Sequence, residues 1–268
     1  MTESRTGRFS GGRIRIGLAE VRASFRAPED EPISLAYFAR PLANLMTPAF
    51  YNLGVTADQV ILLRLLIGGF SLVLFAIGNY WVGFVGLVAF TLAYVLDCVD
   101  GNLSRLDDKG NYWGKFIDGF ADDVVLFAAP FAIAIGLWED GGGGAAMVIG
   151  GIASIIALLT GTARHRFSFV REWMIRRTGP LSDKDTARIN YFERIRNWPV
   201  RLSMNLYCFA PWLILLPEGR WVYLGLTVAF GVSANLIWLA TTVGQASAVL
   251  RRPRQAVHAG EPARKSDV

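Results

Sequence analysis

Four aspartates in two neighbouring apolar segments are the residues whose types and spacing could do chemistry. Asp97 and Asp100 lie near the end of one segment, and Asp118 and Asp122 lie near the start of the next. At about 100° per residue, each pair shares one face of a helix. Because the connection between the segments is short, we expect antiparallel helices whose acidic faces meet.

Such a cluster needs a compensating charge. An ionised carboxylate at mid-bilayer depth costs about 2.5–3.5 kcal/mol, and four together also repel one another. Cations held between them would remove both costs, and an all-oxygen ligand set selects hard ions such as Mg²⁺, Mn²⁺ or Ca²⁺. The spacing therefore predicts a divalent metal site formed by Asp97, Asp100, Asp118 and Asp122.

The residues beside the first pair of aspartates suit a phosphorylated ligand. Gly101 and Ser104 continue the face of Asp97 and Asp100, and their small side chains leave room for a flat base or a diphosphate. Arg105 adds a guanidinium group, whose paired N–H donors match the oxygens of a phosphate.

Other polar residues nearby have simpler interpretations. Asp107 and Asp108 fall in the connection, where solvated carboxylates are ordinary, and Asp123 is off the face of Asp118 and Asp122. We interpret these three as helix-end charges in water or in surface ion pairs. His165 is interpreted as an interfacial residue without a catalytic role.

The candidate residues belong to one longer pattern, Asp97-x2-Asp100-Gly101-x2-Ser104-Arg105-x8-Gly114-x3-Asp118-x3-Asp122. This pattern resembles the signature of the CDP-alcohol phosphotransferases, in which Ala usually stands at the position of Ser104. Upstream, Thr56 and Arg64 match residues that members often carry around the first span, whereas Ala57, Asp58 and Ile61 depart from them.

The resemblance implies a six-helix, homodimeric membrane fold with a polar cavity open to the cytoplasm. Asp97, Asp100 and Asp118 would ligate Mg²⁺ or Mn²⁺, and Asp122 would be the general base, sharing a second metal where two are bound. The nucleotide of the donor would be held by Gly101, Ser104, Arg105 and Gly114.

The reaction expected is transfer of a phosphatidyl group from CDP-diacylglycerol to a small polar alcohol, with release of CMP, in phospholipid biosynthesis. Asp122 would accept the proton of the acceptor hydroxyl as that oxygen attacks the phosphorus distal to the cytidine. A lipid-linked donor explains why the site lies at a membrane interface.

The acceptor is the less determined substrate. Residues 164–201 are strongly basic, and most of these arginines are interpreted as topological charges. Arg164 and Arg171 lie near the inner end of the fourth predicted span, where they could hold an acceptor phosphate bidentately. This pair favours glycerol 3-phosphate or inositol phosphate over serine or a free alcohol.

Two alternatives remain open. One is an enzyme that uses CDP-choline or CDP-ethanolamine as donor and diacylglycerol as acceptor. The other is a metal- or proton-coupled membrane transporter, because intramembrane acids often mark ion paths. A transporter predicts carboxylates spread over the bilayer depth, whereas this sequence gathers them at one end of two segments.

The elements that must position these residues are membrane helices. The sequence has 53% hydrophobic residues and a mean hydropathy of +0.36, more apolar than an ordinary soluble domain. Six segments approach the roughly 20 residues that cross a hydrocarbon core. We therefore predict an all-α integral membrane protein with spans at about 55–78, 82–104, 115–137, 144–167, 199–217 and 221–249.

The remaining segments complete the predicted organisation. Residues 1–32 read as a flexible cytoplasmic arm, 33–50 as an interfacial amphipathic helix, 33–250 as the catalytic membrane domain and 251–268 as a basic cytoplasmic tail. Lys and Arg concentrate in the arm, two connections and the tail, which predicts that both termini and the site face the cytoplasm of a cell (inner) membrane. The net charge of +5 has this origin, and no nucleic-acid-binding module is present.

Overall fold

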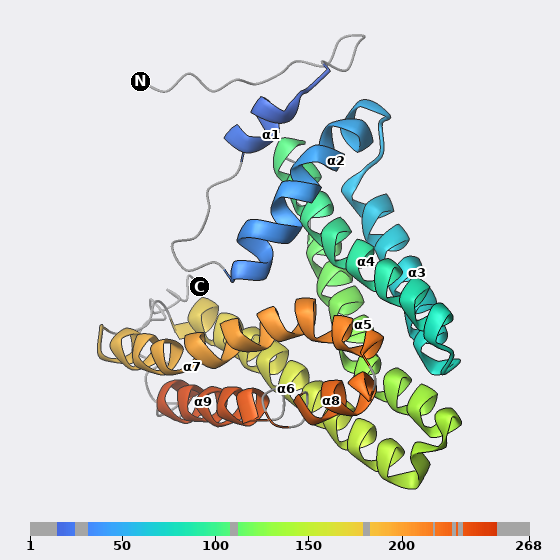
Figure 1. Cartoon of the computed structure of the whole chain (residues 1–268). Coiled ribbons are helices and arrows are strands. Elements are labelled where there is room, and N and C mark those ends of the chain that lie inside the picture. The colour runs from blue at the N-terminus through green and yellow to red at the C-terminus, as the bar shows by residue number, and fades with distance from the viewer. Residues whose placement is uncertain are drawn as a thin grey trace, which may run out of the picture.

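The computed structural model in Figure 1 is built of helices. It describes residues 15–24, 32–107, 112–178, 183–216, 218–226, 229 and 233–250. Within these ranges 92% of the residues are helical and none lies in a strand, which confirms the all-α class.

The helices follow one another with few long connections. Two short π-helical stretches, η1 and η2, and a 3₁₀ stretch, η3, continue or join the α-helices. In chain order the elements are α1 (Leu18–Ala23), η1 (Ser34–Ala39), α2 (Arg40–Asn52), α3 (Ala57–Ala76), α4 (Tyr80–Leu106), α5 (Tyr112–Leu137), η2 (Trp138–Gly142), α6 (Gly143–Thr178), α7 (Asp183–Phe209), η3 (Ala210–Leu215), α8 (Gly219–Leu226) and α9 (Ser233–Leu250).

Three helical stretches of the described chain are long and apolar enough to cross a membrane. They are Ala57–Ala76, Tyr80–Leu106 and Phe116–Trp173. The third covers most of α5 and α6, so it overlaps the third and fourth predicted spans. The fifth predicted span coincides with the end of α7 and with η3, and the sixth is divided between α8 and α9. The total of six crossings stays a prediction.

Side-chain caps define where α3 and α4 begin. Thr56 and Gln59 form a reciprocal capping box, in which the Gln59 N–H donates to Thr56 Oγ1 at 3.3 Å and the Thr56 N–H donates to Gln59 Oε1 at 2.9 Å. Asn79 Oδ1 accepts from the N–H groups of Trp81 and Val82 at 3.0 and 3.2 Å. These caps fix the ends of the antiparallel α3–α4 pair, which lies beside α5 in Figure 1.

Glycines let α5 approach its neighbours closely. A Cβ on Gly136 of α5 would lie 2.2 Å from the carbonyl oxygen of Phe75 on α3. A Cβ on Gly150 of α6 would lie 2.3 Å from Cβ of Ala134 on α5. Only a residue without a side chain fits at either place, so these glycines set how near the helix axes lie.

The chain reverses direction between α5 and α6. Gly141 has φ of 90° and Gly143 has φ of 65°, values in the left-handed region that glycine adopts without strain. The glycine run that begins at Gly141 therefore forms a turn, and it folds α5 and α6 into an antiparallel hairpin.

Large apolar side chains cover the outside of the helices. On α3, Leu62 is 58% exposed and Leu66 is 62% exposed, and α4 and α6 carry further examples. Continuous apolar exposure of this kind is unfavourable in water and favourable in hydrocarbon. The outer surface thus agrees with a membrane location.

The predicted flexible arm contains a helix within its described part. In residues 15–24, α1 is held against the end of α2 by Asn52, whose Oδ1 accepts from the Ile16 N–H at 3.0 Å and whose Nδ2 donates to the Ile16 carbonyl at 3.1 Å. Val21 is fully buried. Backbone N–H groups of Glu20 and Gly17 lower the pKa of the Glu20 carboxyl. Residues 1–14 and 25–31 lie outside the described ranges.

The predicted interfacial segment 33–50 is helical throughout, as η1 and α2. Figure 1 shows α2 lying across α4 near the end that carries the acidic residues. Its location at a membrane interface stays a prediction. The predicted tail 251–268 lies outside the described residues.

Candidate active site

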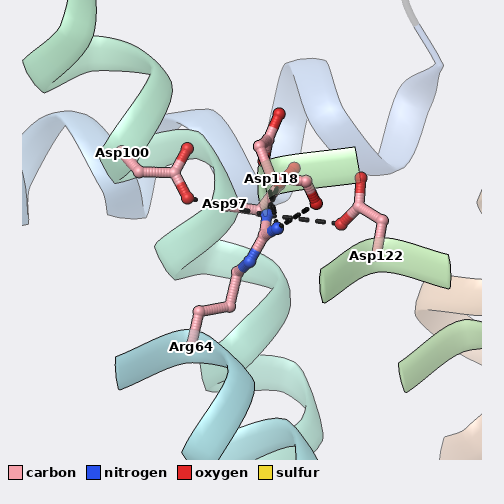
Figure 2. Close-up of polar contacts among 5 residues, drawn as sticks. All are labelled: Arg64, Asp97, Asp100, Asp118 and Asp122. Carbon is pink, nitrogen blue, oxygen red and sulfur yellow. Dashed lines mark hydrogen bonds and ion pairs between the residues drawn. The ribbon is translucent and has the colours of Figure 1, made fainter. Parts of the chain in front are cut away.

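The side chain of Arg64 lies at the centre of the four predicted aspartates. Arg64 comes from α3, Asp97 and Asp100 from α4, and Asp118 and Asp122 from α5. Figure 2 shows the guanidinium surrounded by the acidic side chains of the two other helices. The antiparallel arrangement expected from the sequence therefore brings both acidic faces together.

Each aspartate contacts this guanidinium. Arg64 Nη1 pairs with Asp97 Oδ1, and it lies 3.6 Å from Asp100 Oδ2 and 3.3 Å from Asp122 Oδ1. Arg64 Nη2 donates to Asp118 Oδ1 at 3.0 Å and to the Asp118 carbonyl oxygen at 2.9 Å. One buried cation thus joins residues from three helices.

Burial differs sharply among the five side chains. Arg64 is 4% exposed and Asp100 is 6% exposed, whereas Asp122 is 53% exposed. Asp97 and Asp118 are intermediate, at 32% and 40%. The cluster therefore has a closed side at Asp100 and an open side at Asp122.

The donor set fits a hard divalent cation. One carboxylate oxygen from each of Asp97, Asp100 and Asp118 lies within 4.8 Å of the other two. Asp100 Oδ2 is buried and has no hydrogen-bond partner, which leaves a strong acceptor to be satisfied. Arg64 is a single cation among four carboxyl groups, so the cluster has acidic oxygens enough to bind a further cation.

The residues of the predicted nucleotide site lie along the same end of α4 and α5. Gly101, Ser104 and Arg105 are in the last turns of α4, and Gly114 is in the first turn of α5. A Cβ on Gly101 would meet the Arg105 guanidinium at 3.5 Å, so the bare face of Gly101 is turned toward that cation. Asp107 forms the C-terminal cap of α4, whereas Asp108 lies outside the described residues.

A polar network connects Arg105 to α2. Asn102 Oδ1 accepts from Arg105 Nη2 at 2.7 Å. The Nδ2 of Asn102, a residue with 1% exposure, donates to Asn44 Oδ1 at 3.1 Å and to Thr47 Oγ1 at 3.0 Å. The helix that precedes the first span thereby restricts the position of the predicted phosphate-binding fork.

Comparison with known proteins agrees with this geometry. The sequence profile described as CDP-alcohol phosphatidyltransferase matches residues 54–233, a range that contains all five clustered residues. The chain belongs to this family. Among curated proteins no match is found. Membership in the CDP-alcohol phosphatidyltransferase family makes the protein a membrane transferase of phospholipid synthesis.

An apolar groove of about 1030 Å³ runs between α5 and α6. Its lining includes the polar pair Asp123 and His165, whose Oδ2 and Nε2 atoms lie 2.8 Å apart. Asp123 thus lines the groove and has a partner on α6. The apolar walls include Phe116, Phe120, Val124, Phe127, Phe131, Ile155 and Leu158.

The predicted acceptor arginines both lie on α6. The Arg171 guanidinium lies over the Phe167 ring, with Cζ 5.9 Å from the ring centroid. Its Nε is buried without a hydrogen-bond partner. The side chain of Arg164 lies outside the described residues, so the suggested pair stays a prediction.

Sequence reasoning did not assign roles to Arg64, Asn102 and His165. Arg64 had a clear signal, because an arginine inside an apolar span needs acidic partners. Asn102 gave a weaker signal as an amide within the signature. His165 gave none, because its partner Asp123 is 42 residues away in the sequence.

Proposed function

We propose that the protein transfers a phosphatidyl group from CDP-diacylglycerol to a small polar alcohol and releases CMP. The observation that carries this proposal is the convergence of four aspartates from α4 and α5 at one end of the bundle. Acids gathered at one end suit a reaction site, whereas an ion path would distribute them across the bilayer.

Asp97, Asp100 and Asp118 are proposed to hold Mg²⁺ or Mn²⁺, because they present three oxygens within 4.8 Å of one another. A divalent ion bound there would neutralise charge on phosphate oxygens and on the departing CMP. The three carboxylates contribute fixed negative charge on two helices, so the ligand positions are set by the packing of both α4 and α5 against α3.

Asp122 is proposed as the general base. Its side chain is the most exposed of the four, at 53%, so an acceptor hydroxyl can reach it from the open side. The carboxylate takes the hydroxyl proton while that oxygen bonds to the phosphorus distal to the cytidine, and the bond to the CMP oxygen breaks. Arg64 Nη1, 3.3 Å from Asp122 Oδ1, helps to hold this carboxylate in place.

The donor site is proposed along Gly101, Ser104, Arg105 and Gly114. Gly101 leaves space beside Arg105, which can bind the diphosphate as a fork. The apolar groove between α5 and α6 supports a donor with acyl chains.

The acceptor is proposed to be a small alcohol that carries a phosphate. Arg171 has a buried Nε without a hydrogen-bond partner, which supports an anionic ligand near the end of α6. Together with Arg164 it would distinguish glycerol 3-phosphate or inositol phosphate from serine.

The test is a CMP-release assay with the purified full-length chain in detergent. CDP-diacylglycerol should release CMP only with Mg²⁺ or Mn²⁺ and an added alcohol, and lipid mass spectrometry should identify the product from a panel of acceptors. Release from CDP-choline or CDP-ethanolamine with diacylglycerol, and none from CDP-diacylglycerol, would overturn the proposed donor.

We also propose an inner-membrane homodimer with both termini and the site on the cytoplasmic side. Cysteine variants Ser266→Cys, in the tail, and Glu139→Cys, in η2 at the opposite end from the site, test the orientation. In intact cells an impermeant maleimide should label Glu139→Cys and spare Ser266→Cys. The reverse labelling would place the site on the outer side.

A further inference from the structure

Arg64 is the residue whose surroundings are least explained by the proposed reaction. Its side chain is 4% exposed within an apolar span, and its guanidinium contacts all four aspartates. Nη1 forms ion pairs but lacks a hydrogen-bond partner, and the same is true of Asp100 Oδ2, 3.6 Å away. These two atoms are held together by charge alone.

The guanidinium and a divalent ion need the same oxygens. Asp97, Asp100 and Asp118 form the group that could ligate a metal, and Arg64 contacts every one of them. Oxygen ligands lie about 2.0–2.1 Å from Mg²⁺, closer than any hydrogen-bonded nitrogen. An oxygen lone pair directed at Arg64 is therefore not free for a metal.

Arg64 has a second attachment that does not depend on the carboxylates. Nη2 donates to the backbone carbonyl of Asp118 at 2.9 Å. This bond can keep the side chain near the site after its contacts with Asp97 and Asp100 are given up.

We propose that Arg64 is a positioning residue that serves as the counter-cation of the metal-free site. It holds the four aspartates together before metal binds, and the incoming divalent ion displaces it from Asp97 and Asp100. The inference rests on the metal site of the proposed function and adds a competition between a resident cation and the ion.

Competition gives two opposite effects when the charge of Arg64 is removed. Without metal, Arg64→Gln leaves four carboxylates with no buried cation, so the protein should unfold at a lower temperature. With metal, the ion has no competitor and gains attraction from an uncompensated charge, so the ion should bind more tightly. If Arg64 had a purely structural role, its replacement would lower both the thermal stability and the affinity for the ion.

The experiment measures Mn²⁺ binding by electron paramagnetic resonance and thermal unfolding with EDTA or Mn²⁺. It uses the full-length chain in detergent as wild type, Arg64→Gln and Arg64→Lys. Arg176→Gln is the matched control, because Arg176 is 72% exposed and pairs across the surface with Glu172 at 3.4 Å. It should behave as wild type in both measurements.

For Arg64→Gln we expect an Mn²⁺ Kd at least threefold lower than for wild type, a reduced Tm in EDTA, and a larger rise in Tm on adding Mn²⁺. Arg64→Lys keeps a charge but cannot span several carboxylates, so its Kd should fall between the two. If Arg64→Gln does not fold, an Mn²⁺ Kd of Arg64→Lys below that of wild type would support the proposal instead.

An unchanged or higher Kd in these variants would overturn the role of Arg64. Wild-type protein that binds Mn²⁺ and releases CMP would leave the proposed function intact in that case. Wild-type protein that binds no Mn²⁺ would overturn both proposals.

Discussion

At the scale of single residues, the four aspartates of the cluster differ in how far their side chains are exposed to solvent. Asp100 is 6% exposed and is suited to hold a cation, whereas Asp122 is 53% exposed and is open to an incoming hydroxyl. Identical side chains can therefore do different chemistry because their access to solvent differs.

Asp122→Asn should retain donor binding and lose turnover. An amide of the same shape cannot accept the hydroxyl proton, and a general base contributes roughly 10²–10⁴-fold to rate. The measurement is kcat for CMP release together with CDP-diacylglycerol affinity. Asp123→Asn is the matched control, because Asp123 lies 2.8 Å from His165 and outside the Arg64 cluster. Turnover by Asp122→Asn equal to that of the control would remove the base assignment.

Gly101→Ala should fold normally and bind donor poorly. The added methyl meets no protein atom nearer than 3.5 Å, and alanine favours helix over glycine by about 1 kcal/mol. The methyl would instead occupy the space beside Arg105 where we propose that the nucleotide binds. We expect KM for CDP-diacylglycerol to rise about tenfold, equivalent to about 1.4 kcal/mol, with unchanged Tm. An unaltered KM would exclude Gly101 from the donor site.

At the scale of elements, the spacing of α3 from α5 decides whether Arg64 reaches Asp118 and Asp122. Gly68 lies one turn after Arg64, and a Cβ there would lie 2.7 Å from a methyl of Val125 on α5. Gly69, its neighbour, has no atom within 4 Å of such a Cβ. Alanine at Gly68 would change both helix packing and helix propensity, whereas alanine at Gly69 would change helix propensity alone.

Gly68→Ala should lower both stability and activity, because overpacking costs about 1–3 kcal/mol and moves α5 away from Arg64. Gly69→Ala should leave activity unchanged and raise stability by at most about 1 kcal/mol. The double variant Gly68→Ala with Val125→Ala should recover activity, since it returns the lost space. CMP release and thermal unfolding in detergent measure both effects. Equal behaviour of the two single variants would show that this contact does not position the site.

At the scale of the whole molecule, a second arginine ties the helices together at the end opposite the site. Arg220 of α8 contacts the carbonyl oxygens of Gly78 and Gly136 and the carboxylate of Asp140. Its side chain is 12% exposed. The contact joins the α3–α4 turn, the end of α5 and the C-terminal part of the chain.

Arg220→Met should destabilise the protein without altering metal binding. The substitution leaves partly buried carbonyl oxygens without a donor, at a cost of about 1–3 kcal/mol, while the acidic cluster at the far end is untouched. Thermal unfolding should move to lower temperature, and the Mn²⁺ Kd should stay at the wild-type value. A variant with unchanged Tm would show that the contact contributes nothing to stability.

The sequence by itself determined the helical class, the family and the acidic group. The helical class follows from the length of the apolar segments and the spacing of their residues. The family and the acidic group follow from the Asp97–Asp122 pattern. Both are local properties of the chain. The turn at Gly141–Gly143 was predictable for the same reason, because glycine runs break helices wherever they occur.

Only the tertiary structure decided which partners these residues have. Arg64 lies 54 residues from Asp118, and Asn102 lies 55 residues from Thr47, so no local pattern could pair them. The helix in the N-terminal arm was missed because six residues are too few for a periodic signal, and α1 depends on its contact with Asn52. The cluster of carboxylates follows from composition and spacing, whereas the cation at its centre follows from the packing of three helices.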